Sequence, residues 1–199
     1  MKKLLLSLVS VIFINTAVSA VNYNSDPKIF ITELVEDSLK ILSDKTSNQK
    51  TKEALIEKIA LKNVDIKALG MYTLGDVRKT LNDNELLAYS ELFQKYFLKS
   101  LISRLTEYSS NKFKVLNADQ KNSVYTIVNS KVLADANKPE IKIDWRVYTK
   151  DPLKPLIRDL IVEGLSLART QKEEFASILN SNDGDIKFLF IKLEEFIKN

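Results

Sequence analysis

Apolar side chains recur every three or four positions over the first half of the chain, which is the spacing of one face of an α-helix. This spacing predicts helices over residues 27–42, 65–74 and 82–108, with a further helix around residues 55–60. Two more amphipathic helices close the chain. The long helix over residues 82–108 carries an aromatic-rich stripe formed by Leu86, Tyr89, Phe93, Phe97, Leu101 and Leu105. So long a stripe must be buried against a broad apolar surface.

Capping residues mark where several of these helices begin. Asp26 precedes a proline, and an Asp at this position accepts hydrogen bonds from the free amides of the first turn. Asn82 and Glu85 have the spacing of a capping box, in which each residue satisfies the other's backbone amide. Thr170 and Glu173 repeat that spacing, which predicts the start of the first C-terminal helix there.

The apolar period changes to two in the middle of the chain, as in half-buried β-strands. It predicts strands over residues 113–116, 123–133, 141–148 and 156–162, and their short polar connections imply antiparallel neighbours. The alternation is clearest in the third strand, where one face is made by Ile141, Ile143, Trp145 and Val147. The predicted fold class is therefore α+β, a four-stranded antiparallel curved sheet with amphipathic helices packed on one face.

The first 20 residues have the layout of a secretory signal peptide. Lys2 and Lys3 precede an apolar run over residues 4–14, and small residues lead to Ala20. The run is shorter than the roughly 20 residues that span a bilayer. We expect cleavage after Ala20, which leaves residues 21–199 as a single domain, with two intertwined subdomains as a variant of that organisation. Export without a lipid-attachment Cys predicts a periplasmic protein; the alternative is an uncleaved N-terminal anchor.

The composition excludes several classes of chemistry. The 199 residues include no Cys and no His, which removes disulfides, thiolate catalysis, and the commonest general base and zinc ligand. Charged residues make up 28% and hydrophobic residues 45%, as in a folded domain. The net charge of +4 falls to +2 once Lys2 and Lys3 are removed, and the charges are interspersed. Nucleic-acid binding is therefore rejected.

Few residues are spaced for catalysis. The glycines at positions 70, 75, 164 and 184 form no phosphate-binding loop. Asp144, Asp159 and Glu163 are the candidates for an acid–base group near the sheet, but Lys and Arg alternate with them, which favours solvated or paired charges. The aromatic stripe fits an ordinary core and also a ligand cavity, and its spacing leaves both open.

The segment from Asp159 to Leu167, with Phe175 after it, resembles the D-x-x-V-E-G-V-S-L…F signature of the MlaC family, also called the toluene-tolerance auxiliary family. The aromatic helix and the strand that contains Trp145 are similar to elements of that family, in the same order. The family's Leu-Gly element matches either Leu69-Gly70 or Leu74-Gly75, and both registers stay open. The family's Tyr-Trp pair does not follow Gly75, and its Trp ahead of the signature is absent.

The resemblance implies a periplasmic phospholipid carrier with an elaborated NTF2-like fold and an apolar cavity between sheet and helices. Such carriers exchange lipid with an outer-membrane lipoprotein–porin complex and an inner-membrane ABC transporter bearing an MCE ring, which maintains outer-membrane lipid asymmetry. The expected protein is a monomer, is not an enzyme and needs no cofactor, since phospholipid is its cargo. Each CH₂ of an acyl chain kept from water contributes about 0.8 kcal/mol, which an apolar cavity supplies without acid, base or metal.

Eight residues are expected to line the lipid cavity: Phe93, Phe97 and Leu101 of the long helix, Ile143, Trp145 and Val147 of the third strand, and Val162 and Leu167 around the signature. Glu163, Gly164 and Ser166 are assigned to structure, as a tight exit from the strand and a turn or cap. Two alternatives remain. One is an exported NTF2-like enzyme that acts on a small apolar substrate through Asp144, Asp159 or Glu163. The other is a protein-binding adaptor with a filled core.

Overall fold

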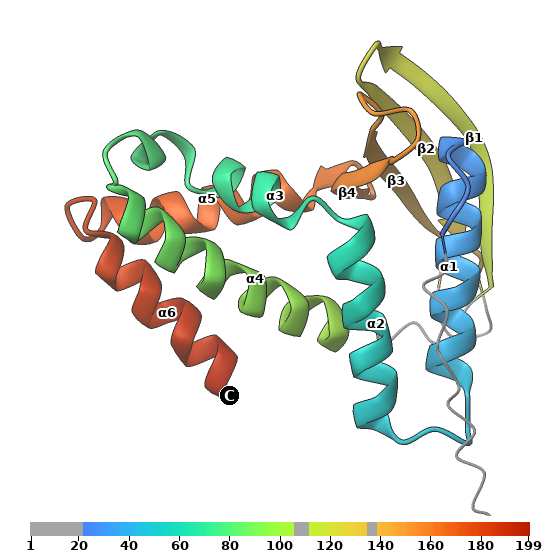
Figure 1. Ribbon diagram of the computed structural model, residues 1–199, viewed down its shortest axis with the longest axis horizontal. Helices are drawn as coiled ribbons and strands as arrows, with labels where there is room; N and C mark the ends of the chain where they lie inside the picture. The colour runs from blue at the N-terminus through green and yellow to red at the C-terminus, as the bar shows by residue number, and fades with distance from the viewer. Residues whose placement is uncertain (1–21, 106–111, 135–138) are drawn as a thin grey trace, which may run out of the picture.

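The computed structural model describes residues 22–105, 112–134 and 139–199, in which a group of helices lies beside a curved antiparallel sheet (Figure 1). In chain order the elements are α1 (Pro27–Ser43), α2 (Gln49–Asn63), α3 (Ile66–Thr73), the 3₁₀ helix η1 (Gly75–Lys79), α4 (Asp83–Leu105), β1 (Phe113–Asn122), β2 (Tyr125–Val132), β3 (Ile141–Tyr148), β4 (Leu156–Val162), β5 (Leu165–Ser166), α5 (Leu167–Asn180) and α6 (Ile186–Lys198). This order of helices, strands and helices confirms the predicted α+β class. The predicted extension of α4 to residue 108 lies outside the described residues.

Two of the three predicted helix caps are present. The Asp26 carboxylate accepts the amides of Lys28 and Ile29 at 2.9 and 3.0 Å and so opens α1. Asn82 and Glu85 form the reciprocal capping box at the start of α4, with N–H···O distances of 2.9 and 3.0 Å. These caps are local in sequence, which is why the pattern alone identifies them.

The third predicted cap is wrong. Helix α5 begins at Leu167 rather than after Thr170, and its N-cap is Ser166, whose side chain accepts the Arg169 amide. Thr170 lies inside the helix, where its hydroxyl donates to the Ser166 carbonyl oxygen at 3.1 Å. The helix starts earlier because Ser166 ends the preceding strand and already supplies a capping oxygen.

The sheet has five strands in the order β1-β2-β3-β4-β5, each antiparallel to its neighbours, rather than the four that the pattern predicts. The extra strand is the two-residue β5. Strand β1 also continues to Asn122, beyond its predicted end at Leu116, because residues 117–122 pair with β2 along an exposed, polar part of the hairpin. That segment has no buried face, so it shows no apolar alternation.

One core lies between α1 and the sheet. Antiparallel pairing sets Trp145 opposite Val128 and Leu160, and Val147 opposite Ile157, so these side chains share one face, called here the inner face. Helix α1 covers part of this face. The resulting sheet core consists of Phe30, Ile31, Leu34, Val35, Val128, Val147 and Ile157.

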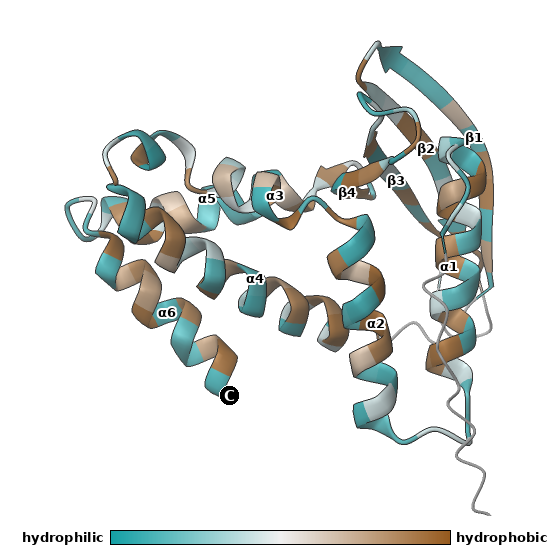
Figure 2. Ribbon diagram, in the orientation of Figure 1, coloured by the Kyte–Doolittle hydropathy of each residue, from teal (hydrophilic) through white to brown (hydrophobic). Residues whose placement is uncertain are grey.

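A second core joins the helices. Its buried members come mainly from α3, α4, α5 and α6, and Figure 2 shows that hydrophobic and hydrophilic residues alternate around each helix. This helical core consists of Ala60, Ile66, Leu69, Leu74, Tyr89, Phe93, Leu98, Ala168, Phe175, Leu179, Ile186, Leu189 and Leu193. Val64 packs against both cores and therefore marks where they meet.

Phe93 is the centre of the aromatic packing in the helical core. Its ring is 5.7 Å from Tyr89 and 6.3 Å from both Phe97 and Phe175, measured between ring centroids. Gly70 of α3 lies directly against it, since a Cβ at this position would be 2.9 Å from Phe93 Cδ1. The absence of a side chain at Gly70 lets α3 approach α4. Within the described ranges no helix is both long and apolar enough to span a bilayer.

Candidate functional site

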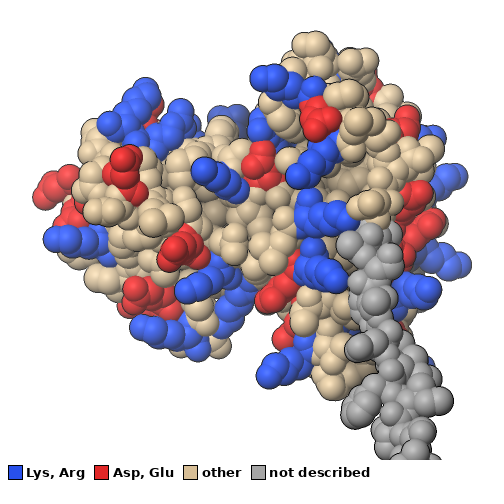
Figure 3. Space-filling view, in the orientation of Figure 1, with Lys and Arg blue, Asp and Glu red and all other residues tan. Residues whose placement is uncertain are grey.

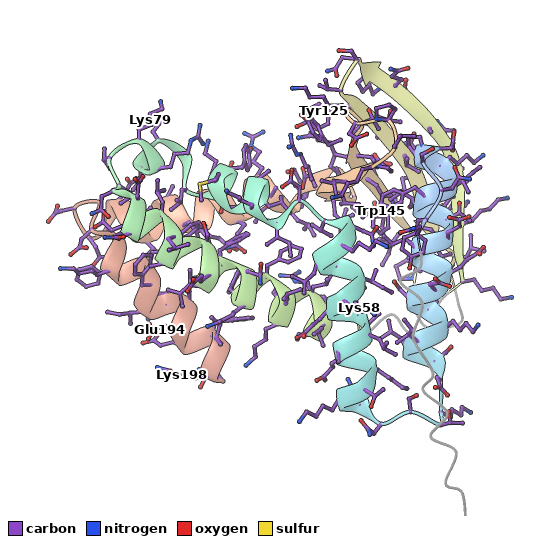
Figure 4. All side chains as sticks on the ribbon, in the orientation of Figure 1. Lys58, Lys79, Tyr125, Trp145, Glu194 and Lys198 are labelled. Atoms are coloured by element: carbon purple, nitrogen blue, oxygen red, sulfur yellow. The ribbon has the colours of Figure 1, made fainter. Side chains whose placement is uncertain are left out.

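The Trp145 side chain (labelled in Figure 4) is fixed on the inner face by polar contacts. Its indole N–H donates to Ser130 Oγ at 2.8 Å, and the Ser130 hydroxyl donates to the Ile143 carbonyl oxygen at 2.7 Å. The ring also meets Phe113 edge to face, with centroids 6.2 Å apart. Because the indole N–H is satisfied within the sheet, the half-buried ring presents an apolar surface.

An apolar strip continues from Trp145 toward the β5 edge of the inner face. Ile143 and Val162 lie opposite each other, and so do Val162 and Leu165. We call this row the inner strip: Ile143, Trp145, Leu160, Val162 and Leu165. Neither described core includes Ile143, Leu160, Val162 or Leu165, and Leu165 is 68% exposed. A partly exposed apolar row of this kind is suited to contact with an apolar ligand.

The eight predicted lining residues divide into groups. Val147 is fully buried in the sheet core and Phe93 is buried in the helical core. Phe97 and Leu101 are half-buried and pack against the helical core from α4, and Leu167 is half-buried at the start of α5. The remaining three, Ile143, Trp145 and Val162, belong to the inner strip. Lipid contact at all eight positions stays a prediction.

The family-like segment builds the junction between β4 and α5. Glu163 and Gly164 connect β4 to β5 in two residues with φ values of 49° and 83°, as a type I′ turn requires. Glu163 also extends the pairing with β3, because its amide donates to the Lys142 carbonyl oxygen at 3.0 Å and its carboxylate accepts the Lys142 amide. The structural roles predicted for Glu163 and Gly164 are confirmed by these contacts.

Asp159 of β4 stabilises the same junction through its buried carboxylate. The residue is 3% exposed, and its carboxylate accepts the Ser166 hydroxyl at 2.6 Å and the Ala168 amide at 3.0 Å. Arg146 lies 3.8 Å away and provides a positive charge. The predicted capping role of Ser166 is also confirmed, since its Oγ accepts the Arg169 amide. One buried carboxylate thus joins the strand to the first turn of α5.

The contacts of the three candidate acid–base residues are structural. Asp144 accepts the Asn129 side-chain amide at 2.7 Å, and Asp159 and Glu163 are engaged at the junction just described. Across the ranges that the structure describes, no three Asp or Glu side chains gather as metal ligands would. These observations give the enzyme alternative no specific support.

The sequence analysis did not predict a set of side-chain contacts, centred on Arg158, that joins β4 to the start of α3. The guanidinium of Arg158 lies 3.4 Å from the centroid of the Tyr148 ring, donates to Asp65 at 2.8 Å and donates to the Tyr125 hydroxyl at 3.0 Å. Asp65 also caps α3 through the Ala68 amide. Because Asp65 is 93 residues from Arg158, no local pattern indicates this contact.

A pocket of about 260 Å³ was missed as well. It lies where the end of α2 and the start of α3 meet α4 and the loop between β3 and β4. Its lining consists of Leu61, Lys62, Val64, Asp65, Ile66, Lys67, Gln94, Lys154 and Leu156. These residues come from segments far apart in the chain, so a linear pattern could not group them. Ligand pockets for drug-sized molecules have about 300–1,000 Å³, so this space is small for a whole lipid.

An open antiparallel sheet with its inner face partly covered by α1, beside a separate helical core, defines an α+β fold of packed sheet and helices. The MlaC protein family model matches residues 32–195, and the chain belongs to the MlaC family. Among solved structures the chain is similar to the phospholipid-binding protein from Ralstonia solanacearum, which was solved in complex with a phospholipid. The two share 20% sequence identity with a TM-score of 0.70, over 84% of this chain and 94% of the other. This likeness establishes the fold. No curated protein matches the chain.

Proposed function

We propose that this chain is a phospholipid carrier that holds acyl chains against the inner strip. The observation that carries the proposal is the half-buried apolar row at Ile143, Leu160 and Val162, which lies outside both described cores and continues from Trp145 at the margin of the sheet core. Membership of the MlaC family supports it, as does the likeness to a protein solved with a phospholipid.

The physical chemistry of such binding needs only apolar surface. Each acyl CH₂ removed from water contributes about 0.8 kcal/mol, so the transfer of a dozen such groups from water is favourable by roughly 10 kcal/mol. Phe97 and Leu101 on α4 are half-buried and supply further apolar area beside the helical core, and Leu167 is half-buried at the start of α5. The head group can stay in water, where its charge needs no partner from the protein.

The cellular role proposed here follows from the family. The protein is exported to the periplasm, loses residues 1–20, and carries lipid as a monomer without a cofactor. It exchanges that lipid with an outer-membrane lipoprotein–porin complex and an inner-membrane MCE-type ABC transporter, and so maintains outer-membrane lipid asymmetry. The proposed signal segment lies outside the described residues.

Neighbouring residues on opposite faces of β4 allow a matched test. Val162 belongs to the inner strip, whereas Ile161 pairs with Asp144 and points to the other face. Val162→Asp should lower the amount of phospholipid that copurifies without detergent at least tenfold, while Ile161→Asp should retain it, with circular dichroism showing both variants folded. Equal retention by both variants would contradict lipid binding at the inner strip.

A further inference from the structure

Exposed lysines and leucines lie at and beside the pocket at the junction of α2 and α3. We call this group the basic patch and define it by Lys58, Leu61, Lys62, Lys67, Leu153 and Lys154. Lys58 lies one turn before Lys62 on α2, and Lys67 and Lys154 stand at the pocket. Figure 3 shows Lys and Arg side chains gathered along α2.

Two of the acidic groups near the basic patch, Asp65 and Asp151, are engaged in contacts of their own. Asp65 pairs with Arg158 at 2.7 Å, so its charge is largely matched. Asp151 accepts the Leu153 amide at 3.0 Å within the loop between β3 and β4. Lys62 donates to the Asn22 side chain at 2.6 Å and still contributes its positive charge. The patch as a whole therefore favours an anionic partner.

Two leucines of the basic patch are strongly exposed. Leu61 is 50% exposed and Leu153 is 84% exposed. Two hydrogen bonds fix the turn that carries Leu153. The Leu153 amide donates to the Asp151 carboxylate at 3.0 Å, and the Lys154 amide donates to the Asp151 carbonyl oxygen at 3.2 Å. Exposed leucines beside lysines are the combination that interfacial protein segments use at anionic membranes.

We propose that the basic patch docks the protein on an anionic lipid bilayer. The lysines face the head groups, and Leu61 and Leu153 enter the headgroup layer. A bilayer suits this surface because two leucines at separate points need no complementary shape in a fluid layer. The proposal goes beyond carriage of lipid on the inner strip, since the patch and the strip share no residue.

Vesicle cosedimentation of the purified protein tests this docking. Vesicles of equal parts phosphatidylglycerol and phosphatidylcholine should bind the protein at low salt, and pure phosphatidylcholine vesicles should not. Each lysine near an anionic surface strengthens binding about fivefold, so Lys58→Gln, Lys67→Gln and Lys154→Gln together should weaken the partition coefficient about 100-fold. Leu153→Asp should weaken it as well.

Matched controls carry the same changes elsewhere on the surface. Lys114→Gln, Lys142→Gln and Lys187→Gln remove three other exposed lysines, and Leu87→Asp alters a leucine that is 61% exposed on α4. These variants should bind within about threefold of the unchanged protein. An equal loss of vesicle binding in patch and control variants would overturn the proposal. So would the absence of vesicle binding by the unchanged protein, and that outcome would point to an acidic protein as the partner. Copurified phospholipid is measured in every preparation, so failure of docking is distinguished from failure of carriage.

Discussion

Ser166 donates its hydroxyl to the buried carboxylate of Asp159 across 2.6 Å, and this bond ties β4 to the start of α5. The same carboxylate accepts the Ala168 amide. The residues of the family-like segment therefore have an identifiable physical task, which is to turn the chain sharply from strand to helix beside the inner strip.

Removal of the Asp159 carboxylate should destabilise the protein. Asp159→Ala leaves the half-buried Ser166 hydroxyl and the buried Ala168 amide without their acceptor, at a cost of about 2–3 kcal/mol in the free energy of unfolding. Ser166→Ala removes an N-cap at a cost of about 1 kcal/mol. Urea denaturation of both variants and of the double variant should show a coupling energy of at least about 0.5 kcal/mol. Fully additive losses would show that the two side chains act independently.

Gly70→Ala should also destabilise the fold. The added methyl would meet the Phe93 ring at 2.9 Å, and overpacking of this kind costs about 1–3 kcal/mol. Phe93→Leu in the same chain should recover part of the loss, because it removes the ring that Cβ meets. If thermal unfolding of the double variant shows the two losses simply adding, the close approach of α3 to α4 does not constrain this site.

Phe93 and Phe97 should respond differently to truncation. Phe93→Ala opens a cavity in the helical core and should cost about 3–5 kcal/mol of stability. Phe97 is half-buried, so Phe97→Asp should leave the protein folded while copurified phospholipid falls. Denaturation and lipid extraction on the same preparations separate the two effects. An unfolded Phe97→Asp variant would show that Phe97 is an ordinary core residue.

Alkaline pH should weaken the fold through Tyr89. Burial raises the pKa of its phenol above the ordinary value of 10, and its hydroxyl lies 2.7 Å from Thr73 Oγ1. The stability linked to the neutral phenol is fully present below pH 10 and is lost as pH rises through the raised pKa, at up to about 1.4 kcal/mol per pH unit. Tyr89→Phe should reduce the slope of unfolding free energy against pH above 10.

Tyr23 provides the comparison for that titration. Burial and the nearby Asp37 carboxylate raise the pKa of its phenol too, so Tyr23→Phe should reduce the alkaline slope independently, and the double variant should be flatter than either single variant. If the slope is unchanged in Tyr89→Phe, another group controls the alkaline transition.

The sequence predicts those elements whose signals are local. The cap at Asp26, the box at Asn82 and Glu85, and the bounds of β3 and β4 all depend on residues within one or two turns or on strict alternation. The start of α5 differs from its prediction because Ser166 takes the capping role, held by a buried acceptor seven residues earlier. Strand β1 is longer than predicted because pairing with β2, and no apolar pattern of its own, defines its outer half.

The sequence likewise predicts only part of the candidate site. Alternation predicts that Ile143, Trp145 and Val147 share a face, and the strand register confirms it. Which of them stays accessible depends on where α1 lies, and α1 buries Val147 but leaves Ile143 half-buried. The basic patch combines α2, α3 and a loop about 90 residues later, so only the fold brings it together.

Native mass spectrometry of protein purified without detergent tests the carrier proposal most directly. The unchanged protein should carry a mass increment equal to a phospholipid, and collisional activation should release that lipid intact. The Val162→Asp variant should show the unliganded mass under the same conditions. An unchanged protein that stays unliganded after incubation with phospholipid vesicles would contradict the proposal and favour an adaptor with a filled core.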